Sequence, residues 1–362
     1  MATGRKARIE LLDVAKAITI FLVIVGHTTS NTDTVMYRRV LYAFHMPLFF
    51  FLAGLSTKPR PVHGFRDWRQ FLRKNTLALV VPYVIWGLIY GPFSFANLPQ
   101  LAYGSWEALG QIGTLTSLWY LVGFFVARVF VQVIINLLDV RGKADDTLVC
   151  GLCSLPLFAI GLLLPRLEQG YPWCLNVAFV AAGFILLGIG LRRNLLIFAI
   201  QNEWILLGTL IGNIALLAVG TVARGDACDL VLMCGSQYGN LFWFFLNSAS
   251  GTMAVLITSM LLVRIARELL SIRLGFISFI GMHTMGIFLL HKPVLQEVLM
   301  PFFSSWIPGP QLVVALVASL AALALSMGLC VVIEHYIPEL LGNFPVFPTP
   351  IIALERLRKK KG

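Results

Sequence analysis

Long runs of apolar residues, separated by short polar segments, dominate this chain. A helix needs about 20 predominantly apolar residues to cross the hydrocarbon core of a bilayer, which is about 30 Å thick. Runs of this length predict an all-α polytopic membrane protein with about ten transmembrane helices. The predicted spans are residues 11–29, 41–57, 75–92, 117–139, 147–165, 174–192, 204–223, 240–263, 275–298 and 311–335.

The composition supports a membrane protein and argues against several other classes. Hydrophobic residues make up 58% of the 362 positions, and only 12% are charged. Soluble domains carry about 25% charged residues. The net charge is +11, but the basic residues are scattered between the spans, so we expect no nucleic-acid partner. Cys150 and Cys153 lie in an apolar run without partner ligands, and we expect no metal site.

The distribution of basic residues predicts an orientation. Loops on the cytoplasmic side of a membrane are enriched in Lys and Arg. If residue 1 starts on the cytoplasmic side, alternating spans place most of the 28 basic residues on that side. The outer loops then hold only Arg38, Arg39, Arg166 and Arg224. We therefore expect a multi-pass protein of the cytoplasmic membrane with both termini cytoplasmic, comprising a transmembrane domain at 1–344 and a short basic tail at 345–362.

The first predicted span carries three polar side chains, Asp13, Lys16 and His27. A charge at the bilayer centre costs at least roughly 2.5–3.5 kcal/mol, so such groups usually have a partner or a function. His27 lies eleven positions after Lys16, which corresponds to about 16 Å and about three helical turns. Both side chains should therefore share one face. Asp13 and Lys16, three residues apart, could also simply neutralise each other.

Three histidines are expected at a similar depth near the outer surface. His27 ends the first span, His45 lies in the outer third of the second, and His291 lies in the outer half of the ninth. A single interfacial histidine is more often a packing residue, but three on different helices favour a functional cluster. Trp119 and Tyr120 open the fourth span, where they are either substrate contacts or members of an aromatic belt.

This layout suits acyl transfer. An imidazole with a pKa near 6.5 can deprotonate a hydroxyl that attacks a thioester. A cation about 16 Å away along the helix could hold the phosphates of a long donor. Acyl-coenzyme A has that shape, with a polyphosphate head and an extended arm that ends in the thioester. Its head would lie near Lys16 on the cytoplasmic side, and its thioester would reach His27.

Several segments resemble the integral-membrane acyltransferase-3 family. These are Leu12-Asp13-Val14-Ala15-Lys16 with Gly26-His27 ten positions on, the block FHMPLFFFLAG from Phe44 to Gly54, SLWYL from Ser117, RKNTLALVVPY ending at Tyr83, and LLHKP from Leu289. The branch that looks most similar contains fucose 4-O-acetylases and polysaccharide O-acetyltransferases. The resemblance covers essentially the whole chain, and its opening and second-span blocks are the most specific.

The resemblance implies transfer of an acyl group, expected to be acetyl, from cytoplasmic acetyl-CoA to a hydroxyl of an extracytoplasmic or lipid-linked sugar. It implies that His27 is the essential histidine and that Lys16 occupies a basic position on the coenzyme side. Many members carry an Arg-x-x-Arg pair just before the third span, where this chain has Asn75 and Ala78.

We therefore expect the following roles. His27, His45 and His291 form the catalytic site. Lys16, Arg73 and Lys74 bind the coenzyme. Asp13, Trp119 and Tyr120 bind the substrate.

Two other functions are consistent with the sequence. A transporter or exporter of a sugar-linked substrate could use the histidines as a proton relay, although the chain shows no repeat of its hydropathy pattern. A structural subunit of a polysaccharide export complex would fit the composition but would leave Lys16 and His27 without a purpose. Acetylation of a sugar by the purified protein would separate these alternatives.

Overall fold

A computed structural model describes residues 2–28, 36–91, 97–112, 114–139, 146–199, 201–223, 230–307 and 310–343. The described residues are almost entirely helical and contain no strand, which confirms the all-α part of the predicted fold class. The predicted tail at 345–362 lies outside the described residues. The principal helices are α1 (Ala2–Gly26), α2 (Met36–Tyr42), α3 (His45–Ser56), α4 (Gly64–Asn75), α5 (Val81–Tyr90), α6 (Leu98–Tyr103), α7 (Trp106–Gly110), α8 (Trp119–Asp139), α9 (Thr147–Leu163), α10 (Leu175–Phe198), α11 (Glu203–Ala218), α12 (Leu241–Arg264), α13 (Gly275–Met282), α14 (Thr284–Pro293), α15 (Met300–Trp306) and α16 (Gln311–Tyr336).

Seven helical segments of the described chain are long and apolar enough to cross a membrane. They are Met36–Ser56, Gly64–Tyr90, Thr116–Asp139, Pro172–Leu195, Glu203–Ala223, Leu241–Leu269 and Gln311–Tyr336. The remaining three predicted spans also lie on helices. α1 carries Glu10, Asp13 and Lys16 along its length, α9 has only 17 residues, and the segment predicted at 275–298 is interrupted.

The interruption divides the predicted ninth span into two helices. α13 ends at Met282 and α14 begins at Thr284, with His283 between them in a non-helical conformation. The His283 imidazole pairs with Glu334 of α16 at 2.8 Å. A π-helical segment, η9 (Val294–Leu299), follows α14 directly after Pro293. The second predicted span is divided in the same way, into α2 and α3 around Ala43 and Phe44.

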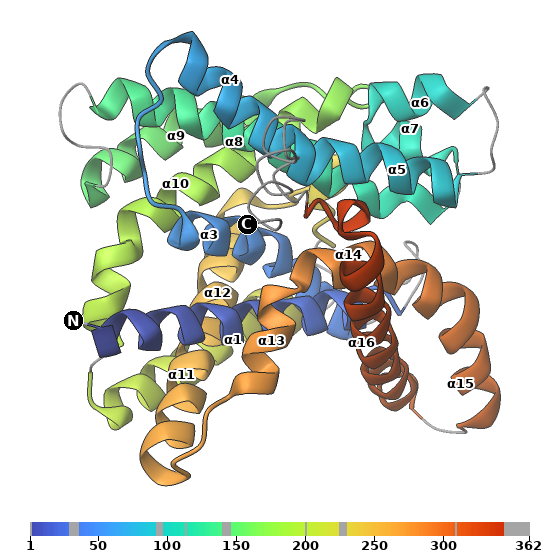
Figure 1. The fold of residues 1–362 in the computed structure, drawn as a ribbon. Coiled ribbons are helices and arrows are strands. Elements are labelled where there is room, and N and C mark those ends of the chain that lie inside the picture. Colours follow the sequence, from blue (N-terminus) through green and yellow to red (C-terminus); the bar gives the residue numbers. More distant parts are fainter. Residues whose placement is uncertain are drawn as a thin grey trace, which may run out of the picture.

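α1 occupies the centre of the fold. It packs against α2, α3, α12, α13, α14 and α16, and it runs across the middle of the molecule in Figure 1. Its residues Val14, Ala15, Ile20 and Ile24 are fully buried. A second set of contacts joins α10 to α3, α8 and α9. Because α3 contacts both α1 and α10, it links the two groups of helices.

Glycines allow the closest helix contacts. A Cβ atom on Gly54 of α3 would lie 2.1 Å from the carbonyl oxygen of Ile185 in α10, and one on Gly188 would lie 2.2 Å from the carbonyl oxygen of Phe51. Gly281 of α13 meets the backbone of Asp13 in the same manner. In membranes, where apolar burial gives little drive to association, small residues at such crossings let backbones pack closely.

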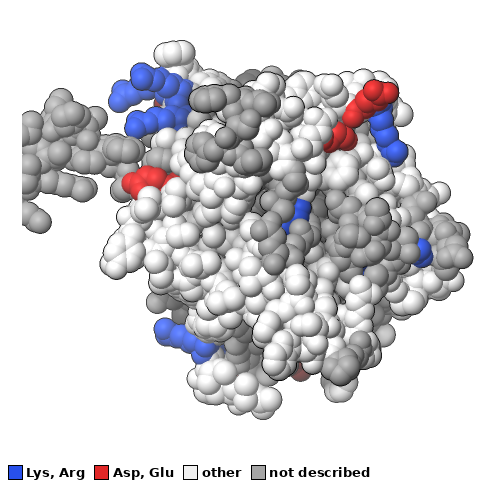
Figure 2. Space-filling view, turned by 90° about the vertical axis from the view of Figure 1, so that its right-hand side faces the viewer, with Lys and Arg blue, Asp and Glu red and all other residues white. Residues whose placement is uncertain are grey.

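The surface is largely uncharged. Figure 2 shows the face toward which α1 runs, and most of its described area is white, with Lys and Arg mainly near the margins. One basic side chain is visible at the bottom of a hollow near the centre. Many large apolar side chains elsewhere are exposed, such as Trp204 and Ile211 on α11. Exposed apolar surface of this extent is expected where a protein contacts lipid.

Candidate active site

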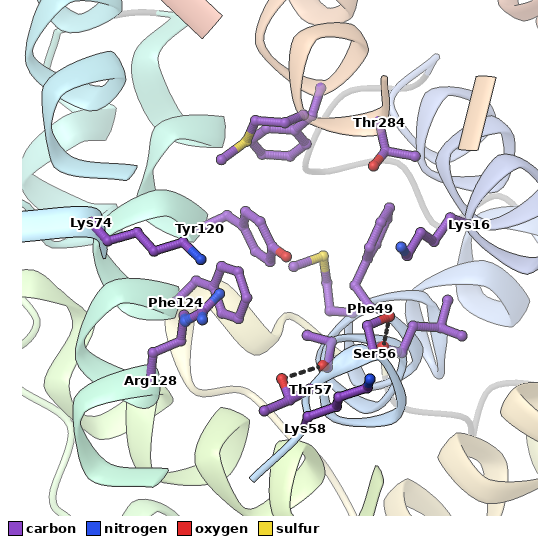
Figure 3. Close-up of a pocket in the computed structure, with 15 residues that line it drawn as sticks. Lys16, Phe49, Ser56, Thr57, Lys58, Lys74, Tyr120, Phe124, Arg128 and Thr284 are labelled. Carbon is purple, nitrogen blue, oxygen red and sulfur yellow. Dashed lines mark hydrogen bonds between the residues drawn. The ribbon is translucent and has the colours of Figure 1, made fainter. Parts of the chain in front are cut away.

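A cavity of about 460 Å³ opens beside the middle of α1, at Lys16. Its wall contains four basic side chains, three from helices and one from the loop after α3, and, among the described residues that line it, no acidic one. These are Lys16, Lys58, Lys74 and Arg128. Figure 3 shows Lys16 on one side of this cavity and Lys74 and Arg128 on the opposite side, with their nitrogens directed inward. We call this space the basic cavity.

The cationic groups of the basic cavity are held by different elements. Lys16 lies on α1 and is 3.8 Å from the carboxylate of Asp13. Arg128 projects from α8 and lies over the ring of Phe124, 5.6 Å from its centroid. Lys74 is the penultimate residue of α4, and the π-helical segment η1 (Thr76–Val80) follows directly after Asn75. Several cations that converge on a cavity whose described lining contains no acidic side chain are the environment expected for a polyphosphate ligand.

A second, much smaller space of about 40 Å³ lies at the far end of α1. Its lining includes His27, His45 and Lys292, together with the aromatic side chains of Tyr42, Trp106 and Trp119. His27 directly follows the last residue of α1, and its backbone N–H still donates to Val23 at 3.1 Å. We call this space the histidine chamber.

The three predicted histidines lie close together. The rings of His27 and His291 have centroids 5.3 Å apart. Tyr42 lies between His27 and His45. Its ring centroid is 6.2 Å from that of His27 and 4.7 Å from that of His45. The Tyr42 hydroxyl lies 3.4 Å from Nδ1 of His27. His27 is half-buried, whereas His45 and His291 are buried.

Backbone carbonyls fix the orientation of two imidazoles. Nδ1 of His45 donates to the carbonyl of Leu41 at 2.7 Å, and Nδ1 of His291 donates to that of Phe288 at 2.8 Å. A carbonyl can only accept, so each Nδ1 carries the proton and each Nε2 holds a lone pair. In both residues Nε2 is therefore the nitrogen that can accept a proton.

Two side chains line both the basic cavity and the histidine chamber. These are Met46 of α3 and Phe288 of α14. Both are buried, and the Phe288 ring packs against Tyr120 with centroids 5.1 Å apart. They form a thin wall, made of one side chain from each of two helices, between a cationic space and a space lined by histidines.

Cys234 is the cysteine that lines the histidine chamber among the described residues. It lies in a short loop helix, Met233–Gly235, between α11 and α12. Burial raises the pKa of the Cys234 thiol to about 12. Because the thiolate is the nucleophilic form, this thiol is poorly suited to carry an acyl group at neutral pH. The histidines are the better candidates for proton transfer here.

A comparison with known protein families identifies the family to which this chain belongs. A family model described as an acyltransferase domain matches residues 9–335. The chain belongs to the acyltransferase-3 family. No curated protein and no solved structure matches it significantly. The protein is therefore a membrane acyltransferase, and its matched region includes every residue of the two spaces described above.

Of the residues predicted to bind the coenzyme, only some line the basic cavity of the acyltransferase. Lys16 and Lys74 line the basic cavity, whereas neighbouring Arg73 does not. The predicted substrate residues also separate. Trp119 lines the histidine chamber and Tyr120 lines the basic cavity, while Asp13 lines neither and contacts Lys16.

The sequence interpretation assigned no role to several residues of the two spaces. Arg128 and Lys292 could have been identified as candidate functional residues from the sequence, because each is a basic residue inside a predicted span. Lys58 lies in a loop rich in basic residues, and nothing in the sequence separates it from its neighbours. Met46 and Phe288 belong to apolar runs in which any residue could face the site. In the described residues, no group of three or more His, Cys, Asp or Glu side chains is arranged to bind a metal ion.

Proposed function

We propose that this protein transfers an acyl group, expected to be acetyl, from acyl-CoA to a hydroxyl group of an extracytoplasmic or lipid-linked sugar. The observation that carries the proposal is the common wall of the basic cavity and the histidine chamber. A donor with its phosphates in the first space needs to pass only its acyl end between Met46 and Phe288 to reach the second. The orientation predicted from the basic residues would place the basic cavity on the cytoplasmic side.

The donor would be held by charge. Coenzyme A carries a pyrophosphate and a ribose phosphate. Their oxygens can accept hydrogen bonds from each cation of the basic cavity, namely Lys16, Lys58, Lys74 and Arg128. The apolar part of the wall, including Phe49 and Tyr120, would pack along the pantetheine arm. Asp13 would then serve to orient Lys16 rather than to bind the acceptor.

His27 would act as the general base. Its Nδ1 faces the Tyr42 hydroxyl at 3.4 Å. With Nδ1 donating to Tyr42, Nε2 would carry the lone pair that takes the proton of the attacking hydroxyl. The imidazolium would then return this proton to the thiolate of the departing coenzyme. His45 and His291 would shape the chamber around the reacting groups.

The acceptor would be a sugar. Trp106 and Trp119 both line the histidine chamber. Flat aromatic side chains provide apolar contact area for the C–H faces of a sugar ring, and Tyr42 adds a hydroxyl that can hydrogen bond. The chamber of about 40 Å³ would have to widen to admit a sugar ring, and a small acyl group such as acetyl would add least to that widening.

The purified protein in lipid vesicles, given acetyl-CoA labelled in the acetyl group, tests the function. The acceptor is glycan and glycolipid extracted from cells that lack the protein. We expect alkali-labile label in the carbohydrate fraction and release of free coenzyme A, with butyryl-CoA at least about tenfold less effective. Movement of an intact sugar-linked substrate without thioester cleavage would instead support the transporter, which the family match does not favour.

Two adjacent basic residues provide a test of the donor site. Lys74→Ala should raise KM for acetyl-CoA about 5-fold, the effect of about 1 kcal/mol expected for a solvent-exposed charge contact. Arg73→Ala is its matched control, because Arg73 is exposed on the same helix but does not line the basic cavity. Steady-state kinetics at several salt concentrations would measure both. Equal effects of the two substitutions would remove Lys74 from the donor site.

A further inference from the structure

Lys292 is a buried cation in the histidine chamber. Only 6% of this residue is exposed, and it lines the chamber together with His27. Its ammonium group donates a hydrogen bond to Oγ1 of Thr116. Within the described part of the chain it forms no ion pair with a carboxylate. Among the described residues, the neutral hydroxyl of Thr116 is therefore the one hydrogen-bond acceptor of this charge.

Such an arrangement is costly for a resting protein. A buried ammonium without a counter-ion loses much of its solvation, and one hydroxyl replaces only part of it. Charged groups inside membrane proteins persist mainly where they pair with another group or serve the function. A fixed cation beside the general base would be useful if negative charge appears in the chamber during the reaction.

We propose that Lys292 is a catalytic residue that stabilises the oxyanion of the tetrahedral intermediate. This inference rests on the proposed acyl transfer. The acceptor oxygen forms a bond to the thioester carbonyl carbon while its proton passes to His27. The carbonyl π electrons move to oxygen, and the resulting oxyanion accepts a hydrogen bond from the Lys292 ammonium. When the carbonyl re-forms, the C–S bond breaks and the thiolate takes the proton back from His27.

The position of Lys292 in the chain fits this role. It is the penultimate residue of α14, and Pro293 and the π-helical segment η9 follow it. Its neighbour His291 is fully buried, with Nε2 lacking a hydrogen-bond partner among the described residues. Thr116 comes from a different element, the 3-10 helix η3 (Thr114–Leu118). Thr116 is thus a positioning residue that holds the ammonium from across the chamber.

Lys292→Met removes the charge and keeps much of the side-chain length. We expect kcat for acetyl transfer to fall about 10²- to 10³-fold, as when one oxyanion donor is lost from other enzymes. KM for acetyl-CoA should change less than about 2-fold, because the interaction forms only in the transition state. Lys292→Arg keeps the cation and should retain more activity than Lys292→Met. Thermal stability in detergent, measured for every variant, identifies any that fail to fold.

Thr116→Val provides a second test, which distinguishes the proposed catalytic role of Lys292 from a purely structural one. Losing one hydrogen bond should lower kcat about 5-fold in the wild-type background, and no further in the Lys292→Met background. A fully active and stable Lys292→Met variant would overturn the inference while leaving the proposed function intact, provided that the wild type still transfers acetyl. A raised KM for the acceptor with unchanged kcat would instead make Lys292 a substrate-binding residue. A wild type that does not cleave acetyl-CoA would overturn both proposals.

Discussion

Replacing His27 by alanine is expected to lower kcat for acyl transfer by about 10²- to 10⁴-fold, the usual contribution of a general base. The imidazole lies at the end of α1 in the histidine chamber, with the His291 ring at 5.3 Å and the Tyr42 hydroxyl at 3.4 Å. An alanine methyl group cannot accept a proton. Neither Tyr42 nor the buried His45 can take its place without moving.

The binding of acetyl-CoA should be nearly unchanged in His27→Ala, because the coenzyme phosphates would bind in the basic cavity. Isothermal titration with the coenzyme and kinetics on the same sample measure the two properties. His335→Ala is the matched control, since His335 is exposed near the end of α16 and lines neither space. A His27→Ala protein that retains wild-type kcat would show that another group takes the proton.

Replacing Gly54 by valine should destabilise the protein more than most single substitutions. Even the first side-chain atom on Gly54 would lie 2.1 Å from the Ile185 carbonyl oxygen and 2.9 Å from Cα of Gly188. These are backbone atoms, so the conflict is relieved only if α3 and α10 move apart. Overpacking typically costs about 1–3 kcal/mol, and a clash with backbone should reach the upper end of that range.

The separation would also disturb the site, because α3 contributes Met46, Phe49 and Ser56 to the wall of the basic cavity. Loss of acetyl transfer should therefore accompany the lower stability. Gly208→Val on α11 is the control, since a Cβ there meets nothing within 4 Å. Thermal unfolding in the same detergent compares the two variants. Equal midpoints would show that the contact between α3 and α10 adapts to a larger residue.

Much of the fold could be predicted from the apolar pattern, since each predicted span overlaps at least one helix of the described residues. The similar depth of His27 and His291 could be predicted once the direction of each helix is assigned, but depth alone does not place the two rings side by side, as the structure does. The breaks at 43–44 and at His283 were not predictable. They fall inside apolar runs, and contacts such as that of His283 with Glu334 depend on elements far apart in the chain.

The lining of the site was harder to predict than its depth. Arg73 and Lys74 are adjacent and equally basic, yet only Lys74 lines the basic cavity. Which of two neighbouring residues faces a cavity depends on how the helix is rotated about its axis. The π-helical segment η1, which follows α4, has more residues per turn than an α-helix and therefore changes the rotation of α4 relative to the helix after it. Sequence periodicity assumes a regular helix and therefore cannot resolve such a choice.

The wall formed by Met46 and Phe288 also bears on the membrane as an electrical insulator. An enzyme that takes its donor on one side and its acceptor on the other contains a potential leak for protons and ions. Two apolar side chains between the spaces leave no polar path for a hydrated ion at that point. An acyl thioester, which is uncharged, can pass where an ion cannot. Under the proposed function, this wall would let the protein transfer an acyl group from one side to the other without dissipating the membrane potential.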